Sequence, residues 1–408
     1  MSILQPTQTN ERIQSLDFLR GFAILGILIM NVQSFSMPGA AYMNPTAYGD
    51  LQGANYWVWI LSHIFGDQKF MTIFSILYGA GIILVTQRAE ERTGSSSGLH
   101  YRRTFWLLII GLIHAHIIWY GDILVHYAIC ALLVYLFRKM KPGNLLVIGI
   151  CLIAVHTILY TFFGMSISNW PPEALEGAKT GWIPGQSEIN LEISKVTGTW
   201  AEQVAHNSQS ALFLETLVFL ILFLWRAGGL MLIGMALYKM GVLTAKRTTR
   251  YYRNGMLVSF LIGFPIVIFG VYKNFQAEWS FEYSMYIGSQ FNYWGSIFVS
   301  FGYICGIMLV AKSQLYPWLR DRFAAVGQMA LTNYIAQSII CTIIFFGIGF
   351  GLFGQIERSG QVLVILALWI VQIAWSRPWL NRFKFGPLEW IWRSLTYWKK
   401  QPMGKERK

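Results

Sequence analysis

The chain carries ten apolar stretches, each long enough to cross a lipid bilayer as a helix. A helix needs about 20 mostly apolar residues to span the hydrocarbon core of a membrane. The stretches are residues 16–37, 70–87, 103–120, 122–138, 144–164, 211–238, 253–272, 288–311, 326–352 and 361–377. The sequence therefore predicts an all-α fold, a polytopic membrane helix bundle of about ten transmembrane helices.

Composition agrees with this prediction and excludes a class of partner. Hydrophobic residues make up 55% of the 408 residues, charged residues only 12%, and the mean hydropathy is +0.45. The formal net charge of +13 is spread among short connections and is not gathered on one face. Nucleic-acid binding needs such a face. We expect the lipid bilayer as a partner, and no nucleic acid.

The distribution of Lys and Arg orients the bundle. With the N-terminus placed in the cytoplasm, few basic residues fall in external connections, namely Lys69, Lys179, Lys195, Lys273 and Arg358. Cytoplasmic connections of membrane proteins are the ones enriched in Lys and Arg. We therefore predict that both termini are cytoplasmic and that residues 166–210 form an external loop. We expect residues 1–382 to form one bundle and residues 383–408 to form a cytoplasmic interfacial helix with a basic tail.

The first apolar stretch has some features of a signal peptide, but its polar residues oppose cleavage. Asp17 precedes the apolar run, and Asn31 and Gln33 interrupt its end. Signal peptides have a basic start and an uninterrupted apolar centre. We expect this stretch to remain in the protein as the first span.

The cysteines give no sign of a disulfide or a metal site. All lie inside apolar stretches without the Cys-x-x-Cys spacing of a zinc or redox motif, at positions 130, 151, 305 and 341. We expect inert, packed thiols.

Polar residues occupy one face of the first span. Asp17 and Arg20 are three residues apart, so on a helix their side chains lie on the same face and can pair. Asn31 falls on that face roughly 16 Å further along, at ~1.5 Å per residue. An Arg at a bilayer edge can also extend to lipid phosphates, so Asp17 and Arg20 are candidates for function or for simple anchoring.

Titratable residues collect in the predicted outer half of the bundle. They include His63, His114, Asp122 and Glu215. A histidine beside a carboxylate is the usual arrangement of a general base. His114 and Asp122 flank a predicted hairpin near Gly121, so the two side chains can meet only if the chain turns back or a water bridges them. Zinc is not expected, because the rings of His114 and His116 point to different faces of a helix.

A second group of polar residues lies nearer the middle of the predicted spans. Arg226 is a lone cation within a span and must face a cavity or a partner. Asn333 and Gln337 share a helix face four residues apart. Such residues either bind a substrate or hold helices together by hydrogen bonds, and the sequence leaves both readings open.

Several motifs resemble one family of bacterial membrane proteins. The opening Leu16-Asp17-Phe18-Leu19-Arg20-Gly21 resembles the start of the YeiB-like family, whose function is unknown. The resemblance continues through residues 69–81, 111–114, 121–124, 329–334 and 386–393. It implies a multi-pass protein of the bacterial cell (inner) membrane.

The Leu-Asp-x-x-Arg-Gly pattern is also similar to the opening of the heparan-alpha-glucosaminide N-acetyltransferases and, more distantly, of acyltransferase family 3. That similarity implies a protein that moves an acyl group from cytoplasmic acyl-CoA to an extracytoplasmic acceptor such as an envelope glycan, with no bound cofactor. Asn31 stands where acyltransferase family 3 has a histidine. The base would then be His114, with His63 as the alternative, and Asp122, Asp17 and Arg20 would be further catalytic residues. Asn31, His63, Arg226, Glu215, Asn333 and Gln337 are the candidates for substrate binding.

Two other classes of function fit the same residues. The charged groups within the spans can mark the path of a small solute through a secondary transporter. The bundle can also be a membrane scaffold for envelope assembly.

The orientation of the bundle can be tested by labelling. In intact cells, a Lys179→Cys variant should react with a membrane-impermeant thiol reagent, and a Lys246→Cys variant should not, because only the first is predicted to be external. The background is a chain without its native cysteines, and the readout is the gel shift of the labelled protein. The reverse pattern of labelling would contradict the predicted orientation.

Overall fold

The computed structural model describes residues 13–313 and 315–405 of the chain. Over these residues the fold is helical, and the one non-helical pairing is an isolated bridge between Phe383 and Gly404. The prediction of an all-α membrane bundle is confirmed. Residues 1–12 of the predicted cytoplasmic N-terminus and 406–408 of the predicted basic tail lie outside the described residues.

Seven helical segments within the described residues are long and apolar enough to cross a membrane. They are α1 (Gln14–Ser36), α3 (Gly53–Phe65) with α4 (Lys69–Thr93), α7 (Pro142–Ser166), α10 (Trp200–Phe213) with the π-helical η5 (Leu214–Phe223) and α11 (Leu224–Lys239), α12 (Thr249–Gln276), the π-helical η6 (Phe281–Gly288) with α13 (Ser289–Lys312), and α16 (Arg358–Arg382). An eighth span is a bent pair, α14 (Pro317–Gln328) with α15 (Ala330–Phe345).

The two other predicted spans form a hairpin of shorter helices. The first is α5 (Ser97–Ile113), which runs into the π-helical η2 (His114–Ile118). The second is α6 (Leu124–Val134), followed by a short turn of 3₁₀ helix. By length and apolar composition neither is a span of its own. The ten predicted spans thus correspond to seven long segments, one bent pair and this hairpin.

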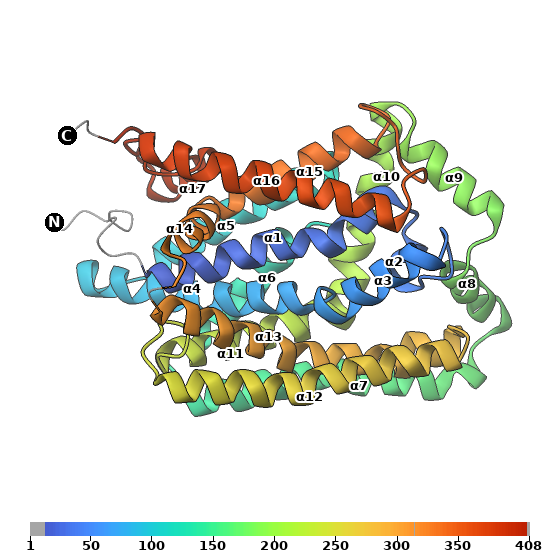
Figure 1. The fold of residues 1–408 in the computed structure, drawn as a ribbon, viewed down its shortest axis with the longest axis horizontal. Helices are drawn as coiled ribbons and strands as arrows, with labels where there is room; N and C mark the ends of the chain where they lie inside the picture. Colours follow the sequence, from blue (N-terminus) through green and yellow to red (C-terminus); the bar gives the residue numbers. More distant parts are fainter. Residues whose placement is uncertain (1–12, 314, 406–408) are drawn as a thin grey trace.

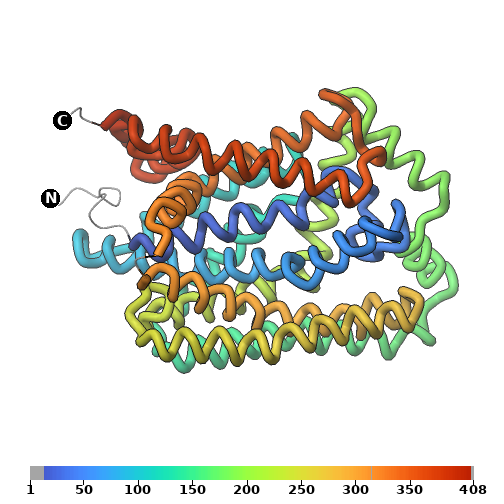
Figure 2. Tube along the Cα trace, viewed as in Figure 1, coloured from blue at the N-terminus to red at the C-terminus, as the bar shows by residue number. Residues whose placement is uncertain are grey.

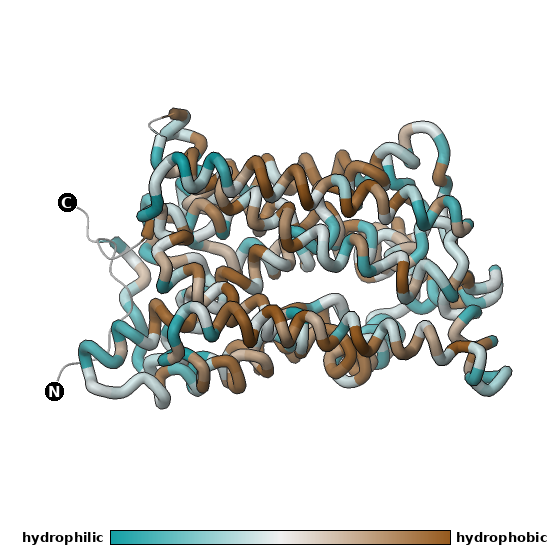
Figure 3. The backbone as a smooth tube through the Cα atoms, turned by 90° about the horizontal axis from the view of Figure 1, so that it is seen from below, coloured by the Kyte–Doolittle hydropathy of each residue, from teal (hydrophilic) through white to brown (hydrophobic). Residues whose placement is uncertain are grey.

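Helix α1 runs through the middle of the molecule (Figures 1 and 2). In its apolar stretch 78% of the residues are buried, against 22% in α7 and 28% in α12 and α16. The outer helices instead expose large apolar side chains, such as Ile158, Leu261 and Ile370. Figure 3 shows apolar residues in the middle of the long helices and hydrophilic ones towards both ends of the molecule. This is the surface expected of a bundle that sits in lipid.

The start of α1 and the C-terminal helix α17 (Pro387–Tyr397) lie at the same end of the bundle (Figure 1). Helices α8 (Pro172–Trp182) and α9 (Gln186–Val196) lie at the opposite end. The segment predicted as an external loop is thus largely helical. It packs on the bundle because Trp182, Ile189 and Val196 are buried, and Trp182 Nε1 donates to the Trp279 carbonyl over 2.7 Å.

Two predicted boundaries differ from the structure. The helix leading into the predicted span 211–238 begins at Trp200, where Thr199 and Glu202 form a capping box. The predicted span 326–352 is broken at Met329, with a bend of 78° between α14 and α15. Apolar patterning reveals neither feature, because the cap depends on two polar residues and the bend falls inside a continuous apolar stretch.

Glycines set the closest helix contacts. A Cβ atom on Gly21 of α1 would overlap the Phe323 carbonyl of α14, and one on Gly327 of α14 would overlap the Asp17 carbonyl of α1. Gly79 of α4 makes the same kind of contact with Met231 of α11. Small residues let helix backbones approach closely in a membrane, where packing drives helix association.

This packing predicts different effects for two glycines of α4. Gly79→Ala should lower the free energy of unfolding by about 1–3 kcal/mol, because the new methyl group forces α4 away from α11. Gly81→Ala should be neutral or slightly stabilising, since an added Cβ atom meets nothing within 4 Å and Ala favours a helix. Thermal unfolding of both variants in detergent checks this. Equal melting temperatures would show that α4 and α11 can separate at little cost.

Candidate active site

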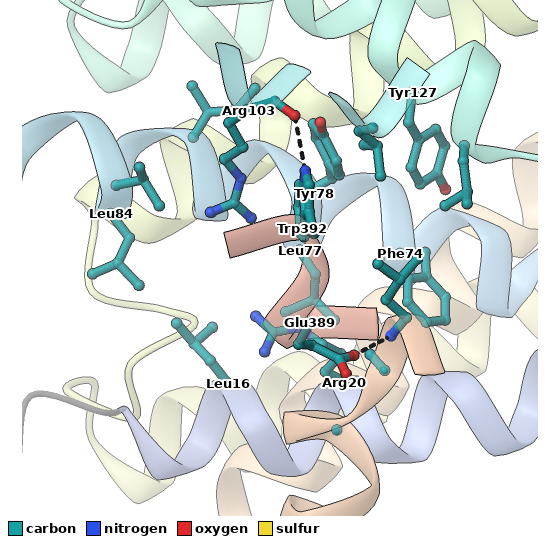
Figure 4. Close-up of a pocket in the computed structure, with 18 of the residues that line it drawn as sticks. Leu16, Arg20, Phe74, Leu77, Tyr78, Leu84, Arg103, Tyr127, Glu389 and Trp392 are labelled. Carbon is teal, nitrogen blue, oxygen red and sulfur yellow. Dashed lines mark hydrogen bonds between the residues drawn. The ribbon is translucent and has the colours of Figure 1, made fainter. Parts of the chain in front are cut away.

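A cavity of about 250 Å³ lies between α1, α4, α5, α6, α15 and α17 (Figure 4). Its deeper wall is apolar and includes Ile27, Phe74, Leu107 and Ile123. Its charged lining residues come from the helix ends near the chain termini, and they are Asp17, Arg20, Arg88, Arg103, Glu389 and Arg393. The cavity therefore combines a cationic rim with an apolar interior.

Asp17 and Arg20 pair on α1, as their spacing predicts. Arg20 Nη1 lies 2.9 Å from Asp17 Oδ1, and both residues line the cavity. The Arg20 side chain keeps 29% of its surface exposed, so the pair sits at the accessible rim. One ion pair of this kind aligns the guanidinium while leaving N–H groups for an anionic ligand.

Helix α17 covers one side of the cavity through Trp392. The Trp392 indole donates to the Arg103 carbonyl over 2.9 Å, and the Arg103 guanidinium lies over the Trp392 ring at 4.2 Å from its centroid (Figure 4). A cation over an indole face is attracted to it. This contact joins α17 to α5 and holds Arg103 at the rim.

Glu389 joins α17 to the start of α15. Its Oε1 accepts from the backbone N–H groups of Leu331 and Thr332 over 2.7 and 3.1 Å, and its Oε2 accepts from the Thr332 hydroxyl over 2.6 Å. The first N–H groups of a helix have no partner within that helix, and a carboxylate there also complements the helix dipole. Burial raises the pKa of Glu389, and hydrogen bonds from Thr332 and Leu331 oppose that shift.

His114 and Asp122 form a buried pair. His114 Nδ1 lies 2.7 Å from Asp122 Oδ1, and Asp122 Oδ2 accepts from the Val125 backbone N–H over 2.7 Å. The contact exists because the chain leaves η2 at Trp119, turns and enters α6. A π-helical turn widens the helix at His114, and such turns often occur at functional sites. The carboxylate holds the His114 proton on Nδ1 and leaves Nε2 as the basic nitrogen.

His114 Nε2 is buried without a hydrogen-bond partner among the described residues. The neighbouring ring is that of Tyr334 on α15, whose centroid lies 5.1 Å from that of His114. Tyr334 lines the cavity, while His114 lies behind it. The side chain of Tyr334 therefore separates the His114–Asp122 pair from the cavity.

The structure places the remaining predicted site residues elsewhere. Asn31 is half-buried on α1, does not line the cavity and has no side-chain hydrogen bond with the described residues. His63 Nδ1 lies 3.2 Å from Asp67 Oδ2 at the break between α3 and α4. Glu215 in η5 lies 3.4 Å from His116 Nε2.

Arg226 is buried, and its hydrogen-bond partners among the described residues are all neutral. Its guanidinium donates to the Tyr293 carbonyl over 2.8 Å and to the Ser296 hydroxyl over 2.8 Å, and it lies over the Tyr293 ring. Lys69 is also buried and donates to Asn292 Oδ1 over 2.6 Å. Asn292 in turn donates to Asp67 Oδ2 over 2.7 Å. These residues form a polar cluster apart from the cavity.

Asn333 and Gln337 connect helices. Asn333 Nδ2 donates to the Val326 carbonyl and to the Ser376 hydroxyl over 3.0 and 3.2 Å. Gln337 Nε2 donates to the Ile24 carbonyl over 3.1 Å and to Gln372 Oε1 over 2.9 Å. These contacts tie α15 to α1, α14 and α16, which is the interhelical role that the sequence left open.

No metal site is formed by the residues that the structure describes, since no group of three or more His, Cys, Asp or Glu side chains gathers to hold an ion. Of the cysteines, three are buried free thiols and Cys151 is exposed and free.

Sequence reasoning missed the residues contributed by distant segments, chiefly Arg103, Tyr334, Glu389 and Trp392. Each belongs to a connection or a motif whose partner lies far away in the chain. The family motifs carried a usable signal, because residues 16–21, 69–81, 121–124, 329–334 and 386–393 all contribute to the cavity lining.

Comparison with known proteins assigns the family. The family model described as "Protein of unknown function (DUF418)" matches residues 237–399. The uncharacterized protein YxaH of Bacillus subtilis is 31% identical over 100% of both chains, and the uncharacterized protein YeiB of Escherichia coli is 31% identical over 95% of this chain and 96% of its own. The chain belongs to this family. A further relative, an uncharacterized 39.9 kDa protein of Bacillus acidopullulyticus, is 28% identical over 98% of both chains. The DUF418 match ends within the segment that follows α17, so the cavity helices α15 and α17 lie inside it.

The role of Glu389 can be tested by stability. Glu389→Ala should cost about 1–3 kcal/mol of folding free energy, because it leaves the buried N–H groups at the start of α15 without partners. A suitable control is Glu282→Ala, which breaks only an exposed ion pair with Lys179 and should have little effect. Thermal unfolding of both variants in detergent gives the comparison. A Glu389→Ala variant as stable as the control would show that water or another group caps α15 equally well.

Proposed function

We propose that the protein is an acyltransferase of the bacterial inner membrane. It takes an acyl group from cytoplasmic acyl-CoA and passes it to an extracytoplasmic acceptor such as an envelope glycan. The observation that carries this proposal is the cavity itself. Its cationic rim lies at the end of the bundle that holds the predicted cytoplasmic termini, and its apolar interior leads to Tyr334, directly in front of the His114–Asp122 pair.

The rim suits a donor that carries phosphates. Arg20, Arg88, Arg103 and Arg393 line it, and guanidinium groups bind phosphate through paired hydrogen bonds. The rim's two carboxylates are already engaged, Asp17 by Arg20 and Glu389 by the start of α15. An anionic head group therefore meets an excess of positive charge.

The volume of the cavity interior suits the pantetheine arm and acyl group of acyl-CoA. Pockets that enclose a whole small-molecule ligand usually have volumes of roughly 300–1,000 Å³. At about 250 Å³ the cavity is smaller, and it is lined by aliphatic and aromatic side chains such as Leu77 and Phe74 (Figure 4). We infer that the pantetheine arm and a short acyl group enter, while the nucleotide stays at the rim.

The buried pair supplies the base. With its proton held on Nδ1 by Asp122, His114 presents Nε2 to accept the proton of an attacking hydroxyl or amine. Asp122 then stabilises the imidazolium that forms. This chemistry needs no metal or bound cofactor.

Transport of a small solute is the second candidate, and the polar cluster of His63, Asp67, Lys69, Asn292 and Arg226 favours it. Buried charges in a membrane bundle often mark an ion or solute path. The cluster lies at the break between α3 and α4, and broken helices are common at transporter binding sites.

Acyl transfer predicts a clear set of variant activities. With radiolabelled acetyl-CoA and oligosaccharide released from the host envelope, His114→Ala should lower the rate roughly 10²- to 10⁴-fold, the usual contribution of a positioned base. Asp122→Asn should also lose activity, and Arg20→Ala should mainly raise the KM for acetyl-CoA. Asn31→Ala should matter less, because an amide cannot accept the proton.

The control variant is Cys151→Ala, whose thiol is exposed and away from the cavity, and it should keep full activity. A folded His114→Ala protein with undiminished transfer would remove the base from this mechanism. Solute uptake that fails in Asp67→Asn cells, without any acyl transfer by the wild type, would favour the transporter.

A further inference from the structure

We propose that Tyr334 is a further catalytic residue, one that contacts the acceptor and relays its proton to His114. This inference rests on the proposed acyl transfer and names the group through which the buried base acts. It follows from the position of His114, which does not line the cavity, and of Tyr334, which does.

Two buried polar atoms lie on neighbouring rings. His114 Nε2 is buried without a hydrogen-bond partner among the described residues, and the Tyr334 hydroxyl is buried near the Ile123 backbone without a well-aligned hydrogen bond to it. The two rings meet with centroids 5.1 Å apart and planes at 52°. Buried polar groups in native proteins are nearly always satisfied, so two such atoms at one place indicate a missing substrate group or water.

Another tyrosine of the same cavity shows the contrast. The Tyr127 hydroxyl lies 2.9 Å from the Ser75 hydroxyl and donates to the Met71 carbonyl over 3.2 Å. Tyr127 is therefore a satisfied wall residue. Tyr334 differs in that its residue lines the cavity while its ring packs against the ring of His114.

The surrounding contacts fix Tyr334 in place. Thr332, two residues earlier, is held by Glu389 of α17, and Asn333 accepts from the Trp375 indole of α16 over 3.1 Å. Asp122 fixes the other ring through the 2.7 Å contact with His114. The helix turn that carries Tyr334 and the ring of His114 are thus both held in place, and general acid–base catalysis depends on such positioning.

The proton relay needs no reactant beyond the acyl donor and the acceptor. The acceptor hydroxyl or amine attacks the thioester carbonyl carbon and forms the new C–O or C–N bond. Its proton passes to Tyr334 Oη while the Tyr334 hydroxyl proton passes through one bridging water to His114 Nε2. The C–S bond then breaks with its electron pair on sulfur. The imidazolium returns the proton through Tyr334 to this thiolate, and free CoA leaves.

The decisive variant is Tyr334→Phe, which keeps the ring against His114 and removes only the hydroxyl. We expect its kcat for transfer from acetyl-CoA to the envelope oligosaccharide to fall roughly 10²- to 10⁴-fold, with the KM for acetyl-CoA within about twofold of the wild type. The matched control is Tyr252→Phe, a buried tyrosine outside the cavity whose hydroxyl donates to the Val242 carbonyl. It should keep the wild-type kcat.

A structural role and a relay role give different results. If Tyr334 served only to pack the helices, Tyr334→Phe would keep the wild-type kcat. Of the two variants, His114→Ala alone would then be inactive. That result overturns the relay and leaves the proposed base in place. A wild-type protein that transfers no acetyl group overturns the proposed function and the relay together.

Discussion

The hydrogen bonds between Glu389 and the start of α15 are the interaction on which the cavity depends. The chain bends by 78° between α14 and α15, so the first N–H groups of α15 open inside the protein, away from water. Only an acceptor from another segment can satisfy them. Glu389 does so, and this brings α17 against α15 with Trp392 and Arg393 at the rim of the cavity. The same contacts set the position of Tyr334 one turn further along α15.

Charged side chains inside the bundle are likewise stabilised by hydrogen-bond and ion-pair partners close to them. Asp17 and Arg20 neutralise each other at the accessible rim, whereas Arg226 in the interior is held by carbonyl and hydroxyl oxygens and by an aromatic ring. Burying an ion costs several kcal/mol unless hydrogen bonds replace its water shell. The rim pair can exchange partners with a ligand, while Arg226 is anchored to α13 through Tyr293 and Ser296. This difference is why the rim and not Arg226 is assigned to donor binding in the proposed mechanism.

The residues assigned to the two candidate functions lie in different parts of the bundle. The cavity and the His114–Asp122 pair lie among α1, α5, α6, α15 and α17, and the Lys69–Asp67–Arg226 cluster lies among α4, α11 and α13. Helix α4 contributes to both, with Phe74 and Leu77 in the cavity and Lys69 and Thr72 in the cluster. Helix α4 therefore connects the two regions.

The sequence by itself determined the fold class, the approximate spans and the Asp17–Arg20 pair, because these depend on apolar length and on neighbours along one helix. It also indicated His114 and Asp122, since both lie on one hairpin. Only the tertiary structure brought Arg103, Tyr334 and Trp392 to one cavity and placed His114 behind it. Those contacts join residues separated by hundreds of positions, such as Arg103 and Trp392. They depend on a bend and a buried cap that leave no periodic pattern in the sequence.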